Sequence, residues 1–114
     1  MKESKEPRIF NGIEEVECPG GTVIVRVGSK PKWEVKIYPG ANGASSCKVE
    51  LIDIANQAMP SVLRTKMISK TSEEMRRDLR DSLIKKNPAA VIKDFFDVDP
   101  PQSWYPCVES HSTE

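Results

Sequence analysis

Catalysis in proteins is usually carried by histidine, cysteine and carboxylate side chains, and here their spacing predicts no active site. The single histidine, His111, lies in a polar C-terminal stretch, and no glycine-rich phosphate loop is present. The three cysteines, Cys18, Cys47 and Cys107, are odd in number and have no metal-site spacing, so we expect isolated thiols. We therefore expect a protein that is not an enzyme and takes no cofactor, metal or small-molecule substrate. Chemistry by carboxylates alone is the remaining enzymatic alternative.

Basic residues at alternate positions are the more informative feature. Side chains of a strand alternate between the two faces of a sheet, so residues two apart share a face. Residues 32–38 (KWEVKIY) then separate an apolar face from a polar one, and residues 47–51 and 62–70 show a similar alternation. If the three strands are neighbours, one face gathers these polar residues: Lys32, Glu34, Lys36, Tyr38, Lys48, Glu50, Arg64 and Lys66.

Two interpretations of this face follow from the residues. The simpler one is an ordinary solvated sheet, on which Glu34 and Glu50 form cross-strand ion pairs with neighbouring lysines. The other is a surface for nucleic-acid phosphates, which Arg26 joins from the preceding strand. The chain has 17 basic and 17 acidic residues, so a phosphate site requires the basic groups to be gathered on one face.

The elements that must position this face can be predicted from periodicity. β-Branched and alternating segments separated by turn residues predict strands, and Asn11-Gly12 favours a hairpin turn. A capping box at Thr71–Glu74 starts a helix that runs to about Lys86, and Asn87-Pro88 starts a second helix that ends near Phe96. The order predicts an α+β fold: an antiparallel sheet of about five to six strands followed by two C-terminal helices on one face.

We expect one domain over residues 1–114, with a frayed N-terminus at 1–7 and a tail at 102–114. No stretch of the sequence has the length of apolar residues that a membrane span needs, and Met1 is followed by no apolar signal-peptide core. We expect a soluble protein that stays inside a cell.

The predicted helices carry little apolar surface. The first has only Met75, Leu79 and Leu83 on its inward stripe, and the second has four large apolar residues between Val91 and Phe96. Such helices would cover little of a five- or six-stranded sheet. We therefore expect an interlocked homodimer, in which the helices pack onto the neighbouring subunit's sheet.

The arrangement from Lys32 to Phe96 resembles the coat proteins of levivirus-like single-stranded RNA bacteriophages. The resemblance is carried by the order of the segments KWEVKIY, CKVELIDI, VLRTKMIS and TSEEMRRDLRDSLIKKNPAAVIKDFF, separated by loops. The turn between the helices, Leu83-Ile84-Lys85-Lys86-Asn87-Pro88, and the aromatic pair Trp104-Tyr105 also resemble that family.

The resemblance implies a capsid protein of the virion, assembled in the cytoplasm of a bacterial host as a homodimer that builds an icosahedral shell. The inward sheet face would bind a genomic RNA hairpin and repress translation, through the eight polar residues named above. The sequence departs from the family in a shorter N-terminal portion, a short loop at 55–61 and the absence of the small residues of an adenine pocket. The rival interpretation is a small non-viral dimeric RNA-binding regulatory protein.

Overall fold

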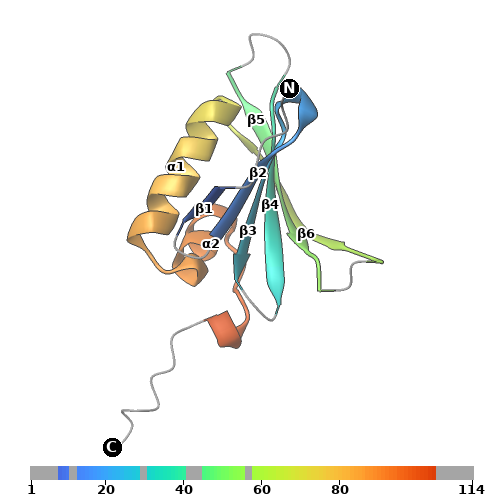
Figure 1. Cartoon of the computed structure of the whole chain (residues 1–114), viewed down its shortest axis with the longest axis vertical. Helices are drawn as coiled ribbons and strands as arrows, with labels where there is room; N and C mark the ends of the chain where they lie inside the picture. Colours follow the sequence, from blue (N-terminus) through green and yellow to red (C-terminus); the bar gives the residue numbers. More distant parts are fainter. Residues whose placement is uncertain (1–7, 11–12, 29–30, 41–44, 56–57, 105–114) are drawn as a thin grey trace, which may run out of the picture.

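The structure, a computed structural model, is a six-stranded antiparallel sheet with two helices on one side (Figure 1). It describes residues 8–10, 13–28, 31–40, 45–55 and 58–104. The strands are β1 (Arg8–Phe10), β2 (Ile13–Glu17), β3 (Val23–Gly28), β4 (Lys32–Tyr38), β5 (Cys47–Asp53) and β6 (Ser61–Ile68), ordered in the sheet as in the chain. The helices are α1 (Ser72–Lys85) and α2 (Pro88–Phe96), with short 3-10 turns at Pro19–Gly21 and Gln102–Trp104. The predicted fold class is confirmed.

The register of the sheet assigns each strand residue to a face, because directly opposite residues point the same way. Val35 of β4 lies opposite Val25 of β3 and Leu51 of β5, and all three are buried. The register shifts between Leu51 and Ile52, where Leu63 is an extra residue in β6. The change of phase at Leu51–Ile52 in the sequence predicts a bulge or a strand end there, and the structure has a bulge, with β5 continuing to Asp53.

The two helices begin where their caps predict. The Thr71 hydroxyl accepts from the Glu74 amide while the Glu74 carboxylate accepts from the Thr71 amide, which completes the predicted capping box. The Asn87 side chain accepts from the Ala89 amide ahead of α2. Asp97 then ends α2 in the left-handed conformation, with φ of 58°.

The core lies between the helices and one face of the sheet. The helices contribute Met75, Leu79, Leu83, Val91, Ile92 and Phe96, each at most 2% exposed. They pack over β3, β4 and β5 of the same chain. The expected shortage of core is wrong for this chain, since its own helices bury its own sheet. The core therefore gives no reason to expect that helices are exchanged between subunits, and dimerisation stays a prediction.

Trp104 anchors the segment after α2 to the β3–β4 end of the sheet. Its indole N–H donates to the Pro31 carbonyl at 2.7 Å, and its ring lies 4.8 Å from the Trp33 ring. Gly28 has φ of +83°, and a Cβ there would lie 2.2 Å from the Trp104 ring. A glycine at position 28 is thus required by both the backbone and the close approach of the indole.

Several expectations fall outside the described residues. These are the frayed residues 1–7, the turn at Asn11-Gly12, and the part of the tail from 105 to 114, with Tyr105, Cys107 and His111. Phe10 and Ile13, which flank positions 11 and 12, pair in antiparallel register.

Candidate nucleic-acid interface

The side of the sheet away from the helices carries most of the residues proposed for RNA. On β4 and β5, Lys36 lies opposite Glu50 and Tyr38 lies opposite Lys48. On β3, Arg26 lies opposite Glu34 and Gly28 lies opposite Lys32. Since neither helix packs on this side, we call these strand positions the open face. Six of the eight predicted residues lie on it: Lys32, Glu34, Lys36, Tyr38, Lys48 and Glu50.

The expected position of Arg64 and Lys66 on the open face is wrong. Arg64 pairs with Leu51 and Lys66 pairs with Val49, and both partners point into the core. The Lys66 ammonium group donates to the Phe95 carbonyl of α2 at 3.2 Å, so it reaches over the helix side. Charged residues are tolerated there because β6 lies at the sheet edge, outside the strands that the helices mainly cover.

In place of those two residues, β6 contributes Thr65 and Met67 to the open face, opposite Glu50 and Lys48. Val62 lies opposite Ile52, on the same side of the sheet. The alternation in residues 62–70 predicts that Thr65 and Met67 lie on the face opposite to Arg64 and Lys66, which is the apolar face in the other two strands, and this prediction is wrong. The useful clue was the change of phase at Leu51–Ile52, since a bulge decides how the next strand pairs.

The described open face is nearly balanced in charge. Its basic side chains are Arg26, Lys32, Lys36 and Lys48, and its acidic side chains are Glu14, Glu34 and Glu50. Without Arg64 and Lys66 the positive excess is only one. Binding of RNA here must therefore depend on where individual charges lie rather than on the net charge of the face.

Arg26 is held by two acidic neighbours. Its guanidinium donates to Glu34 at 2.9 Å and lies 3.1 Å from Glu14. The hydrogen bond to Glu34 and the charge of both carboxylates raise the pKa of Arg26. The contacts of Arg26 therefore agree with the interpretation of the face as a solvated sheet with cross-strand ion pairs.

Tyr38, Lys48 and Glu50 form a second group on the open face. The Tyr38 hydroxyl donates to Glu50 Oε1 at 2.9 Å, and Lys48 Nζ lies 3.7 Å from Glu50 Oε2. The same ammonium lies 4.7 Å from the centre of the Tyr38 ring. Desolvation and then the bond to Glu50 raise the pKa of Tyr38 to about 12, so its hydroxyl stays protonated at neutral pH.

Lys32 and Lys36 differ from the other basic residues of the face. Within the part of the chain that the structure describes, neither forms an ion pair, although Lys36 lies opposite Glu50. Lys32 is exposed and Lys36 is half-buried. These two ammonium groups are the ones free to meet a phosphate.

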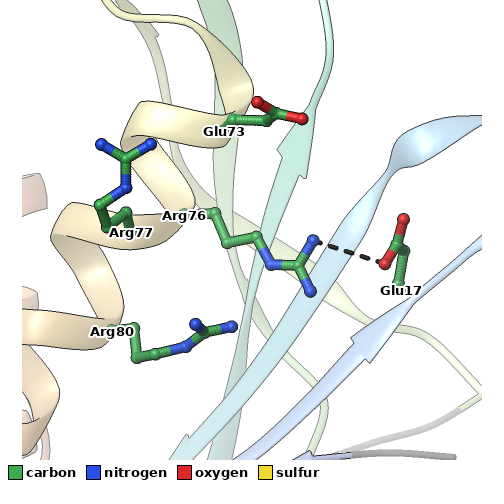
Figure 2. Close-up of a pocket in the computed structure, with 5 residues that line it drawn as sticks. All are labelled: Glu17, Glu73, Arg76, Arg77 and Arg80. Carbon is green, nitrogen blue, oxygen red and sulfur yellow. Dashed lines mark hydrogen bonds and ion pairs between the residues drawn. The ribbon is translucent and has the colours of Figure 1, made fainter.

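A different charged cluster lies on the helix side, where α1 meets β2 (Figure 2). Glu15 is 2% exposed and accepts from Arg80 at 2.8 Å on both carboxylate oxygens, and from Arg76. Arg76 also reaches Glu17 at 3.5 Å, whereas Arg77 points away from β2 in Figure 2. A surface pocket of about 280 Å³ lies beside this cluster and is lined by Glu17, Glu73, Arg76, Arg77 and Arg80. The guanidinium groups of Arg76 and Arg80 are already engaged by Glu15 and Glu17, so we assign the pocket a structural role.

The described residues contain no group of three or more potential metal ligands, and none of their helices is long and apolar enough to cross a membrane. Cys18 and Cys47 are free thiols, and burial raises the pKa of Cys47, which makes it a poor nucleophile.

Comparison with known proteins gives no relative: no family model, curated protein or solved structure matches this chain. Its function has to be argued from its own geometry.

Proposed function

We propose that this chain is a self-assembling coat protein that packages single-stranded RNA, in keeping with its resemblance to the levivirus-like coats. The observation that carries the proposal is an open sheet face that ends on a long edge strand, β6, with exposed apolar side chains. Subunits would assemble by pairing through β6, and RNA would bind to the open face.

The edge strand β6 is long enough to pair with a strand of another chain. It spans eight residues, pairs among the described residues with β5 alone, and exposes Val62 at 55% and Met67 at 67%. Natural proteins shield long apolar edges, because free N–H and C=O groups recruit other strands. The bulge at Leu63 leaves Arg64–Ile68 as the regular stretch for such pairing.

A second copy of this chain is the proposed occupant of that edge. Two β6 strands related by a two-fold axis perpendicular to the sheet would pair antiparallel and join two sheets into one. Both open faces would then lie on the same side, and both helix layers on the other. This arrangement doubles both the area and the number of open-face lysines available to RNA.

RNA binding would rest on the lysines of the open face. Lys32 and Lys36 supply free ammonium groups, and Lys48 supplies a third that is only loosely held by Glu50. Phosphate contacts of this kind give affinity without sequence selectivity. In this proposal the protein belongs to the virion, assembles in the cytoplasm of a bacterial host, and represses translation when it binds a genomic hairpin.

The role of β6 in assembly is tested by Met67→Glu, which places a charge on the open face at the sheet edge. We expect sedimentation velocity to show loss of assembled species while circular dichroism shows a folded chain. Ile84→Glu is the matched control, because Ile84 is 52% exposed on α1, away from β6. Equal effects of both variants on assembly would contradict pairing through β6.

The role of the open face is tested by comparing Lys36→Ala with Arg64→Ala. If Lys36 contacts a phosphate, its loss lowers the slope of log K against log salt by about one, whereas Arg64→Ala leaves the slope unchanged. Equal losses from the two variants would mean that the open face is not the RNA surface.

A further inference from the structure

Glu50 is a carboxylate at the centre of the proposed RNA face, with a fixed orientation. Oε1 accepts from the Tyr38 hydroxyl at 2.9 Å, and Oε2 lies 3.7 Å from Lys48 Nζ. The Glu50 side chain is 18% exposed. Each carboxylate oxygen has two acceptor positions, so both oxygens keep capacity for a further donor.

A carboxylate among phosphate-binding lysines calls for a reason, since it repels phosphate. An ionised carboxylate only accepts hydrogen bonds, and the donors that RNA offers are base N–H groups and 2′-hydroxyls. Guanine carries two parallel donors, N1–H and N2–H, side by side on its Watson–Crick edge. Adenine and cytosine present one amino group there, and uracil presents one ring N–H. A fixed carboxylate with two accepting oxygens therefore fits guanine best.

The surroundings of Glu50 also suit a base. Thr65 lies opposite Glu50 on β6, and Met67 lies opposite Lys48 and is 67% exposed. Met67 gives exposed apolar surface on the neighbouring strand. Lys48, whose ammonium lies over the Tyr38 ring, places a positive charge within reach of an adjoining phosphate.

We propose that Glu50 selects guanine in single-stranded RNA, accepting from N1–H and N2–H while Tyr38 holds the carboxylate in place. This inference rests on the proposed RNA binding by the open face and adds a base preference to it. Glu34 offers no equivalent site, because Arg26 donates to it at 2.9 Å and its side chain is 12% exposed.

The test measures binding of short oligoadenylate RNAs that carry one central guanine, inosine or adenine, by fluorescence anisotropy at fixed salt. Inosine keeps N1–H and lacks the N2 amino group. For the wild-type chain we expect guanine to bind about tenfold more tightly than adenine, the size of effect typical of a two-bond base contact, with inosine between them. Glu50→Gln should bring the three affinities within about twofold, and Glu34→Gln should leave the preference intact.

Tyr38→Phe provides a second variant, which keeps the carboxylate and removes the hydroxyl that orients it. We expect a reduced guanine preference in a chain that folds like wild type by circular dichroism, and this variant decides the question if Glu50→Gln does not fold. Equal wild-type affinities for guanine and adenine, or a preference unchanged in the variants, would overturn the inference. If Lys36→Ala still weakened all three RNAs, the proposed RNA face would survive that failure. Absence of binding to any RNA would overturn both the guanine preference and the proposed RNA binding by the open face.

Discussion

Replacement of Glu15 by alanine is the sharpest test of how the helix layer is fixed to the sheet. Glu15 is 2% exposed and binds both Arg76 and Arg80 across the α1–β2 contact. Removing one partner of a buried ion pair costs about 3–5 kcal/mol. The arginine side chains are 22% and 28% exposed and regain some water, so we expect the lower end of that range, about 3 kcal/mol. At roughly 4 °C per kcal/mol for a chain of this size, the melting temperature should fall by about 12 °C.

The assay is thermal unfolding followed by circular dichroism, with Glu14→Ala as the control. Glu14 is the neighbouring residue on the opposite face, and its side chain is 32% exposed in an ion pair with Arg26. Such a surface pair is worth about 0–1 kcal/mol. A double-mutant cycle of Glu15 with Arg80 should give a coupling energy above about 1 kcal/mol. If Glu15→Ala and Glu14→Ala were equally mild, the Glu15 cluster would not hold α1 on the sheet.

Two further predictions concern the sheet ends and the open face. Gly28→Ala should displace Trp104 and destabilise the fold by about 1–2 kcal/mol more than Gly20→Ala does. Gly20 is the control because it also has positive φ, but an added Cβ there meets nothing within 4 Å. Unfolding curves and tryptophan emission check this, and equal losses of stability in the two variants would contradict the Trp104 contact. The raised pKa of Tyr38 predicts that its absorbance step lies near pH 12 and that stability falls as pH rises from about 10 toward 12, since the folded chain keeps a proton that the unfolded chain releases. Glu50→Gln should lower this pKa, and an unchanged titration would mean that the hydrogen bond is not formed.

Much of the fold was predictable from local patterns. The alternation in KWEVKIY gave the bounds of β4 directly, and the side chains of Thr71, Glu74 and Asn87 predicted where the helices begin. These features depend on residues close in sequence, so periodicity and capping rules suffice to find them.

The faces of β6 depended on information from outside the strand. Alternation within β6 predicted a core side with Thr65 and Met67, yet pairing with β5 places both on the open face. The helices do not cover the sheet at its edge, so the alternation of polar and apolar side chains in an edge strand does not show which side of the sheet is buried. The contact of α1 with β2 could not be predicted for a related reason: Glu15, Arg76 and Arg80 join the two elements over 61 to 65 residues of sequence, which no local pattern reveals.

The central claim is that this chain assembles around RNA, and electron microscopy of the protein expressed alone in bacteria tests it most directly. We predict closed icosahedral particles that contain nuclease-protected RNA and that are lost in the Met67→Glu variant. Protein that stays dimeric with bound RNA at every concentration and salt would contradict the account and favour a regulatory RNA-binding protein. Purified protein that carries no RNA would contradict both the coat-protein proposal and the regulatory alternative.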